Sequence, residues 1–334
     1  QISSLIWLTP SFILFSGMIV CSLILVSCSS SLSMCWLGLE LNTLGFIPFI
    51  LKDNSKGLSE SSVKYFLTQA FASSILLLGI LSASNSLGSW AESMNLFVLL
   101  ALFVKLGVAP FHGWVPSMAE PLHWWVLFML LTVQKVNPLI IFLSQTWMLK
   151  FMFIGVCFSV LVGGIGGICE VRLRKILVFS SISHMGWVLA TLFLSTKLIV
   201  LYFVSYSLLL AAVVAVICKL NLQHLVQMSS SNLSVGWGAA VFINLLSLGG
   251  LPPFFGFLPK WMVLEMLVLE GLYLLVIFMI FSSLLVLYYY LRMAFSSFIL
   301  KKMNWTFEEV FYLGTCSTSL SLFSLGGLTV SFLF

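Results

Sequence analysis

Long apolar stretches separated by short polar segments make up nearly the whole chain. Each stretch has about 20 or more mostly apolar residues, the length that an α-helix needs to cross a bilayer. The pattern predicts an all-α membrane protein of about eleven transmembrane helices, with residues 1–334 forming a single transmembrane domain. The predicted spans are 5–27, 31–51, 62–83, 94–118, 120–147, 149–168, 174–195, 198–219, 235–269, 271–293 and 308–333.

The fourth and ninth spans contain a repeated glycine and proline motif. Residues 110–116 read PFHGWVP and match residues 253–259, PFFGFLP, 143 positions later, and Gly107 matches Gly250. Proline cannot donate a helical hydrogen bond, so each span should break at its motif. Because the copies lie five spans apart, they should cross the membrane in opposite directions, which is typical of inverted-repeat transporters. An alternative is that the prolines only kink packed helices.

The residues expected to break the two helices are Gly107, Pro110, Gly250, Pro252 and Pro253. Broken backbone at membrane depth is tolerated where it lines a cavity or is buried in protein. We therefore expect the two breaks to border the functional path.

Four ionisable residues lie well inside predicted spans: Glu40, Lys105, Lys135 and Lys260. A charge at the bilayer centre costs about 3 kcal/mol on insertion scales, so such residues usually have a function. A lysine near the end of a span can instead extend its ammonium group to the interface, and Glu40 could serve as a structural ion-pair partner. None of the three lysines is at a clear edge of its span, which favours the functional interpretation.

Lysine suits a site that takes up and releases protons. A free lysine has a pKa of about 10.4, burial disfavours its charged form, and a nearby carboxylate favours that form. A buried lysine with an acidic partner that approaches or withdraws is therefore a switchable proton site.

Two histidines are weaker candidates for the same path. His112 lies at the first break, and His184 lies about ten residues after a basic loop. Either could instead be a packed, hydrogen-bonded core histidine. His123 resembles an interfacial anchor beside two tryptophans, and His224 lies in a predicted loop.

Composition excludes several other classes of function. Charged residues make up 7% of the chain and hydrophobic residues 61%, against about 25% charged residues in soluble domains. The polar segments are too short to hold a nucleotide, a flavin or an iron–sulfur cluster. The seven cysteines include no C-x-x-C pair, so no metal site is expected.

Basic residues predict the orientation and explain the net charge of +5 without a nucleic-acid partner. Loops after odd-numbered spans have only Lys150 and Lys197. Loops after even-numbered spans, with their flanks, have nine basic residues, so these loops should face the compartment where the chain is made. The nine are Lys52, Lys56, Lys64, Arg172, Arg174, Lys175, Lys219, Lys301 and Lys302.

With these residues in place, the chain resembles the NADH dehydrogenase subunit 2 family of animal mitochondrial complex I. The similarity covers most of the chain in the family's order. The matching segments are 36–48 (WLGLELNTLGFIP), 64–73 (KYFLTQAFAS), 105–116 (KLGVAPFHGWVP), 134–139 (QKVNPL), 174–187 (RKILVFSSISHMGW) and 247–261 (SLGGLPPFFGFLPKW).

The resemblance implies an antiporter-like, proton-translocating subunit of the membrane arm, located in the mitochondrial inner membrane. In such subunits a glutamate pairs with a lysine on a broken helix, a central lysine follows, and a terminal lysine lies on a second broken helix. Glu40, Lys105, Lys135 and Lys260 match those places. The partners would be other membrane-arm subunits and lipid, while FMN, iron–sulfur clusters and ubiquinone would belong to other subunits.

The chain departs from the family's bacterial members in lacking about three N-terminal helices, as animal members do, which places the N-terminus in the matrix. It begins at Gln1, so a residue or two is expected to be absent.

The resulting hypothesis is a relay of protons between the lysines. A charge change from a neighbouring subunit alters the Glu40–Lys105 contact, and the proton of Lys105 moves to Lys135 and then to Lys260, which releases it outside the matrix. The alternatives are a free-standing cation/proton antiporter, a scaffold whose lysines only join helices, and a receptor-like bundle, which the repeat disfavours.

Overall fold

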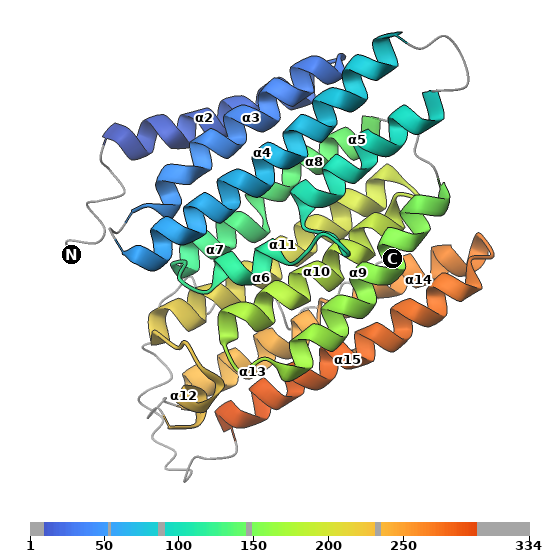
Figure 1. The fold of residues 1–334 in the computed structure, drawn as a ribbon. Helices are drawn as coiled ribbons and strands as arrows, with labels where there is room; N and C mark the ends of the chain where they lie inside the picture. Colours follow the sequence, from blue (N-terminus) through green and yellow to red (C-terminus); the bar gives the residue numbers. More distant parts are fainter. Residues whose placement is uncertain (1–9, 53–54, 86–90, 145–148, 231–234, 299–334) are drawn as a thin grey trace. The chain divides into compact units, whose positions relative to one another are not determined.

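The computed structural model describes residues 10–52, 55–85, 91–144, 149–230 and 235–298 (Figure 1). This part of the chain is helical throughout, apart from turns and one isolated β-bridge. It forms two compact units, Gln1–Met152 and Phe153–Phe334. The first unit contains α2 (Pro10–Cys28), α3 (Leu32–Ile50), α4 (Lys56–Asn85), α5 (Ala91–Leu106), α6 (Trp114–Ala119), α7 (Trp124–Leu131) and α8 (Val133–Ser144). The second contains α10 (Leu173–Thr191), α11 (Thr196–Leu220), α12 (Leu225–Ser230), α13 (Val235–Gly249), α14 (Phe257–Leu269) and α15 (Tyr273–Phe298), and α9 (Leu149–Cys169) begins at the boundary.

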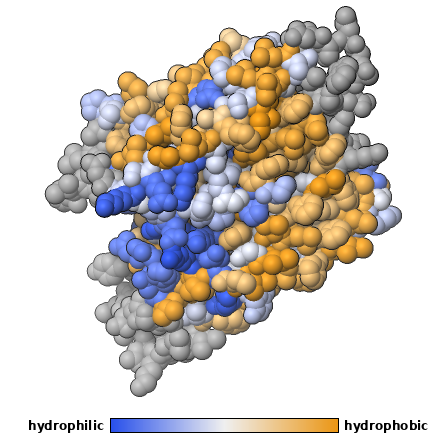
Figure 2. All heavy atoms as spheres, viewed as in Figure 1, coloured by the Kyte–Doolittle hydropathy of each residue, from blue (hydrophilic) through white to orange (hydrophobic). Residues whose placement is uncertain are grey.

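The described helices confirm the membrane-protein fold. Seven apolar segments, one of them made of α7 and α8 together, are long enough to cross a bilayer, and α5 and α13 provide shorter apolar helices before the two predicted breaks. Large apolar side chains such as Ile13, Leu78 and Ile277 are exposed, and Figure 2 shows apolar side chains over much of the visible face, beside a hydrophilic patch. Soluble monomers rarely expose so much apolar surface, whereas lipid covers it. The eleventh predicted span, 308–333, lies outside the described residues.

Small residues bring the helices of the first unit close together. A Cβ atom added to Gly38 of α3 would lie 2.5 Å from the Val26 side chain of α2. Such close approach compensates in lipid for the missing hydrophobic drive between helices. α3 packs on α4, α4 packs on α5, and α8 packs against α2, α3 and α5. The helices that carry Lys105 and Lys135 are therefore neighbours.

Helix α10 is the buried centre of the second unit. Apart from Arg174, Lys175 and Phe179, every residue from Leu173 to Thr191 is buried. Gly163 of α9 allows this packing, since a Cβ there would lie 2.5 Å from the backbone nitrogen of Ser183. Helices α11, α14 and α15 also pack on α10, so its polar residues are enclosed by protein.

Both predicted breaks are present. α5 ends at Leu106 and α6 begins at Trp114, while α13 ends at Gly249 and α14 begins at Phe257. Each first helix ends in a left-handed glycine, Gly107 with φ 68° and Gly250 with φ 79°. Only glycine takes this conformation without a steric cost, which explains why both copies of the repeat keep it.

The fifth span has a third interruption that the sequence did not predict. It was expected as one helix over 120–147, but it divides at Thr132 into α7 and α8. The backbone nitrogen and the hydroxyl of Thr132 both donate to the Phe128 carbonyl, at 3.0 and 2.7 Å. No glycine or proline marks this position, so hydrophobic periodicity alone could not reveal it.

Two basic loops of the second unit meet at one end. A β-bridge joins Arg172 to His224, and the Leu173 nitrogen donates to the Gln223 carbonyl at 3.0 Å. Arg172 precedes α10 and His224 follows α11. This arrangement agrees with the expectation that loops after even-numbered spans face the same side.

Arg292 of α15 caps the C-terminal end of α9 near this basic end. Its two terminal nitrogens donate to the carbonyls of Ile168 and Glu170, both at 2.7 Å. These are carbonyls that the end of a helix leaves without partners, and a cation there also interacts favourably with the helix dipole.

We expect Arg292→Met to destabilise the protein by about 2 kcal/mol, because two charge-assisted hydrogen bonds are lost while the apolar stem is kept. The thermal midpoint of the purified assembly would measure the effect. Lys197→Met is the control, since Lys197 is exposed. An unchanged midpoint for Arg292→Met would show that the cap contributes nothing.

Candidate functional site

The three intramembrane lysines share a structural setting. Lys105 lies in the last turn of α5, Lys135 in the first turn of α8, and Lys260 in the first turn of α14. Each is therefore within a turn or so of a helix interruption, and each is only 6% exposed. Their side chains therefore lie within protein and not on its surface. The C-terminal end of a helix leaves carbonyls without partners, and Lys260 donates to two of these at the end of α13.

Lys105 and Lys135 line one small cavity in the first unit. Its walls also include Asn42, Tyr65 and Gln134, and its volume is about 20 Å³. A cavity of this size with polar walls can hold about one water molecule. The Lys105 ammonium nitrogen, the Gln134 amide nitrogen and the Asn42 amide oxygen are buried and have no hydrogen-bond partner in the described residues. The cavity thus supplies both space and unmet hydrogen-bonding groups between the two lysines.

The carboxylate of Glu40 acts on this cavity from α3. It interacts electrostatically with Lys105 and with Tyr65, but no ion pair within 4 Å joins it to Lys105 in the structure. One carboxylate oxygen is buried without a hydrogen-bond partner among the described residues. Glu40 and Lys105 therefore do not form the predicted direct ion pair in this structure. They can still attract each other, because opposite charges about 6 Å apart interact by about 3 kcal/mol at an effective dielectric constant near 20.

A tyrosine that the sequence analysis missed connects this region. Tyr65 of α4 is buried, and its hydroxyl donates to the side-chain oxygen of Gln134 at 3.1 Å. Gln134 precedes Lys135 in α8, so the hydrogen bond fixes the start of the helix that carries the central lysine. Nothing in the spacing of Tyr65 distinguishes it from an ordinary core aromatic residue.

The first break is packed around Trp114. The Trp114 indole nitrogen donates to the Val104 carbonyl at 3.1 Å, and so supplies a partner near the end of α5. His112 lies within the break and is half-buried, and its Nδ1 atom is buried without a partner in the described part. Pro110 is exposed. His112 therefore lies in the same break as Trp114, and no hydrogen bond joins its Nδ1 atom to the ammonium group of Lys105.

Lys260 is held by the helix end that precedes it. Its ammonium donates to the Gly249 carbonyl at 2.9 Å and to the Leu248 carbonyl at 3.4 Å. It also lies 5.9 Å from the ring centre of Trp187 in α10. A Cβ atom on Gly250 would come within 3.0 Å of the ammonium nitrogen, so glycine is needed for space as well as for backbone conformation. Pro252 and Pro253 follow in the exposed part of the break.

His184 is bound to a group of buried tyrosines in the second unit. Its Nδ1 atom is 2.9 Å from the Tyr202 hydroxyl, and its ring lies 4.8 Å from that of Tyr206. Tyr289 and Tyr290 of α15 are also buried. The sequence analysis expected a polar path at His184 but did not predict these tyrosines, which lie on other helices and at large sequence separations.

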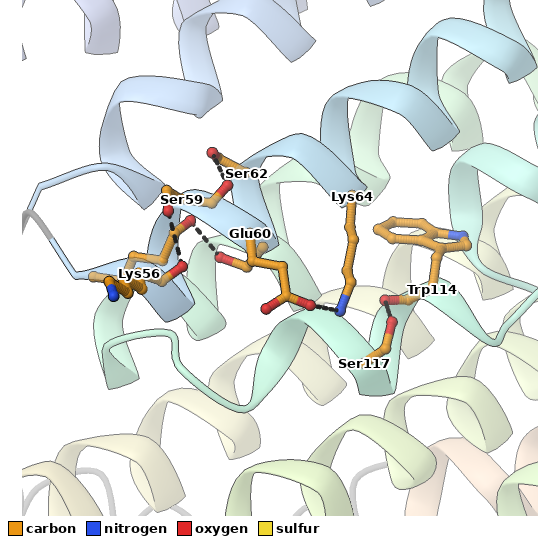
Figure 3. Close-up of polar contacts among 9 residues, drawn as sticks. Lys56, Ser59, Glu60, Ser62, Lys64, Trp114 and Ser117 are labelled. Atoms are coloured by element: carbon orange, nitrogen blue, oxygen red, sulfur yellow. Dashed lines mark hydrogen bonds and ion pairs between the residues drawn. The ribbon is translucent and has the colours of Figure 1, made fainter.

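A surface ion pair lies beside the first break. Glu60 and Lys64 of α4 are 2.5 Å apart and are 67% and 43% exposed, and Figure 3 shows them near Trp114 and Ser117 of α6. Exposed pairs of this kind contribute about 0–1 kcal/mol. Lys64 is thus a solvated charge, in contrast to the three buried lysines.

The predicted site residues form two groups. Glu40, Lys105 and Lys135 belong to the first unit, where the two lysines share the cavity, and Lys260 and His184 belong to the second, where Trp187 lies next to the ammonium group. Among the described residues, no group of three or more histidine, cysteine, aspartate or glutamate side chains is placed to hold a metal ion.

Comparison with known proteins connects this geometry to a family. Residues 29–286 match the family described as NADH:quinone oxidoreductase/Mrp antiporter, TM. The NADH-ubiquinone oxidoreductase chain 2 of Anopheles gambiae is 39% identical over 320 residues, covering 92% of this chain and 93% of that protein. The protein of the same name from Viverra tangalunga is 35% identical over 321 residues, covering 90% and 91%.

Solved structures share the fold at low sequence identity. A chain of respiratory complex I from Thermus thermophilus gives a TM-score of 0.83 at 20% identity, covering 97% of this chain and 79% of that one. A chain of the Mrp complex from Dietzia gives 0.79 at 16%, covering 95% and 74%. The protein therefore belongs to the NADH-ubiquinone oxidoreductase chain 2 family of animal mitochondria, an antiporter-like membrane subunit of complex I.

Proposed function

We propose that this chain carries protons across the mitochondrial inner membrane through Glu40, Lys105, Lys135 and Lys260, driven by electron transfer in other subunits. The observation that carries the proposal is the placement of all three buried lysines at helix interruptions. A charge kept in such a position is costly, and a proton path is the use that explains all three positions together.

The two broken helices support different tasks for their lysines. Lys260 has two backbone carbonyls and an aromatic ring near its ammonium group, so the charged form is well solvated by protein. Lys105 has no hydrogen-bond partner in the described residues, and its charged form depends on Glu40 and on the cavity. Lys105 is therefore suited to be the switch, and Lys260 to hold a proton before release.

In this mechanism Glu40 controls the first transfer. When a charge change in a neighbouring subunit draws the Glu40 carboxylate away, the ammonium form of Lys105 loses its main stabilising partner. The proton then passes through the cavity to Lys135, and from there toward Lys260. Reloading of Lys105 from the matrix, with Glu40 returned, completes the cycle. His112 and His184 are proposed to carry protons along this path as additional groups. The helix breaks are proposed to control the transfer, and they contain Gly107, Pro110, Gly250, Pro252 and Pro253.

The redox chemistry is proposed to lie elsewhere in the complex. FMN, iron–sulfur clusters and ubiquinone would be bound by other subunits, and this chain would contact other membrane-arm subunits and lipid. Its two units would act as one proton-translocating domain over residues 1–334. Nucleic acid is not an expected partner.

Glu40→Gln tests the proposal, with Glu60→Gln as the matched control. We expect Glu40→Gln to lower the ratio of protons translocated to NADH oxidised, because an amide cannot stabilise the Lys105 ammonium by charge. Glu60 is exposed and does not line the cavity, so its variant should behave like the unchanged protein. The measurement is proton uptake into, or release from, liposomes that contain the purified complex.

An unchanged ratio in Glu40→Gln would contradict the switch. The free-standing antiporter gives a different result: the purified chain alone would exchange cations for protons, and it would not co-purify with other subunits in near-equal amounts.

A further inference from the structure

Four buried tyrosines surround α10 in the second unit, and the proposed path does not use them. They are Tyr202 and Tyr206 of α11 and Tyr289 and Tyr290 of α15. The hydroxyls of Tyr206, Tyr289 and Tyr290 are buried and have no hydrogen-bond partner of good geometry in the described residues. A buried hydroxyl that lacks a well-formed hydrogen bond costs up to about 1–3 kcal/mol, so three such groups in one place require an explanation.

The serines of α10 face these tyrosines. The side chain of Tyr289 interacts with Ser183 and Ser180, and that of Tyr206 interacts with Ser181. Each serine hydroxyl donates to a carbonyl of its own helix, at 2.7 to 2.8 Å. The serine oxygens therefore keep their lone pairs as acceptors, and they complement the phenol hydroxyls as donors.

The cluster extends along α10 from the basic end of the unit toward Lys260. Ser180 lies eight residues after Arg172, which is about 12 Å along the helix axis. Tyr289 lies one turn before Arg292, the residue that caps α9 at that same end. Farther along α10, Trp187 stacks on Tyr202 with ring centres 6.1 Å apart, and Lys260 lies over the Trp187 ring.

Neighbouring members of the cluster are close enough to connect the two ends. The rings of Tyr289 and Tyr290 are 4.9 Å apart, and Tyr290 interacts electrostatically with Tyr206. Tyr206 lies against His184, which makes its 2.9 Å contact with the Tyr202 hydroxyl. Neighbouring rings therefore lead from α15 to Tyr202, which stacks beside Trp187, and one step between them, from His184 to Tyr202, is within hydrogen-bonding distance.

We propose that this tyrosine–serine cluster, with His184, is a hydrated relay that brings protons from the basic end of the second unit to Lys260. The inference rests on the proposed function and adds a separate uptake branch to it. In each step a hydroxyl, or His184 through its two ring nitrogens, accepts one proton from the preceding group as it donates its own to the next, so no tyrosine keeps a charge. The last proton passes through water from Tyr202 to the neutral amine form of Lys260, because the Trp187 ring between them cannot carry a proton. Water molecules complete the hydrogen bonds that the three phenols lack. A proton enters at one end for each proton that reaches Lys260.

The sequence Tyr288-Tyr289-Tyr290 provides a matched test. Tyr288 is 57% exposed, whereas its two neighbours are fully buried. A change to phenylalanine removes one oxygen and keeps the ring, including the ring of Tyr289 that packs against Gly167. In the reconstituted complex we expect the double variant Tyr289→Phe/Tyr290→Phe to lower the share of the proton-to-NADH ratio that this subunit carries several-fold, and Tyr288→Phe to leave the ratio unchanged.

Two further measurements keep the outcomes distinct. If Lys105→Met lowers the ratio and the double tyrosine variant does not, the relay is wrong and the proposed function stands. If neither variant lowers it, the proposed function fails as well.

Should the double variant not assemble, a high-resolution map of the unchanged complex decides the matter. We expect ordered water within hydrogen-bonding distance of the Tyr289 and Tyr290 hydroxyls. A map that resolves water elsewhere in this subunit but none at either hydroxyl would overturn the relay.

Discussion

Lys105→Met and Lys135→Met should each stop proton transfer through this subunit while the complex still assembles. Methionine keeps an unbranched apolar side chain of similar length, so packing around the cavity is largely conserved. The change removes a buried charge whose burial costs several kcal/mol, and Lys105 loses no hydrogen bond because it makes none in the described residues. Stability should therefore stay the same or increase. We expect the part of the proton-to-NADH ratio that this subunit contributes to fall by about tenfold. A tenfold decrease corresponds to a proton-transfer barrier raised by about 1.4 kcal/mol or more.

The control is Lys64→Met on α4. Lys64 carries the same charge but is 43% exposed and paired with Glu60. Its loss should change neither assembly nor proton translocation. Subunit content and proton translocation would be measured on the same preparation, so that the two effects are separated.

The scaffold alternative predicts the opposite pattern. If the lysines only joined helices, their replacement would reduce the amount of assembled complex and leave the proton ratio of the remaining complex normal. That result would refute the proton path at its central residues.

The breaks in the fourth and ninth spans could be predicted because backbone chemistry marks them. Gly107 and Gly250 need a left-handed conformation, and the prolines after them cannot continue a helix. These constraints are local, so a pattern of a few residues expresses them. The burial of Lys105 and Lys260 followed from the same motifs, because the lysines lie within a turn of the broken backbone.

The break at Thr132 could not be predicted, because it depends on tertiary packing. Thr132 is neither glycine nor proline, and the proline that follows, Pro138, lies inside α8 and not at the break. Its hydroxyl bonds back to the Phe128 carbonyl, an option that threonine has in any helix. The consequence for function is large, since the break places Lys135 in the first turn of a new helix instead of the middle of an old one.

The groups that surround the buried charges could not be predicted from the sequence either. The carbonyls that bind Lys260 belong to Leu248 and Gly249, and every residue has a carbonyl, so no residue type signals this contact. The open distance between Glu40 and Lys105 depends on how α3 and α5 pack. The tyrosines around His184 are similar in type to the many core aromatic residues of the chain. In each case the side chain was visible in the sequence and its partner was not.

Lys260 shows one physical solution to the burial of a positive charge. A continuous helix uses all its carbonyls internally, whereas a helix end leaves four without partners. Breaking a span therefore creates acceptors inside the membrane without adding acidic residues. This explains how a chain with only 7% charged residues can keep the ammonium group of Lys260 in its interior, and it makes the geometry of the second break as important as the lysine itself.

Gly256→Ala should therefore be among the most damaging small substitutions in the chain. Gly256 lies at the end of the second break, just before α14, and a Cβ atom there would lie within 1.8 Å of the Ser247 carbonyl oxygen. The clash is with backbone, which cannot move away as a flexible side chain would. α14 would have to shift away from α13, and the carbonyls of Leu248 and Gly249 would separate from Lys260. We expect a destabilisation of about 4 kcal/mol or more and little assembled complex.

Gly113→Ala is the matched control, because Gly113 occupies the same place in the first copy of the repeat. Nothing lies within 4 Å of a Cβ atom added there, and Gly113 has an ordinary right-handed backbone. Alanine should thus be tolerated, with normal assembly and normal proton translocation. Subunit content of purified membranes and thermal stability of the complex would measure both variants. If Gly256→Ala were tolerated as well as Gly113→Ala, the close packing of the second break would not hold Lys260 in place. One added methyl group would then cost no stability at Gly256, where the backbone of Ser247 should block it.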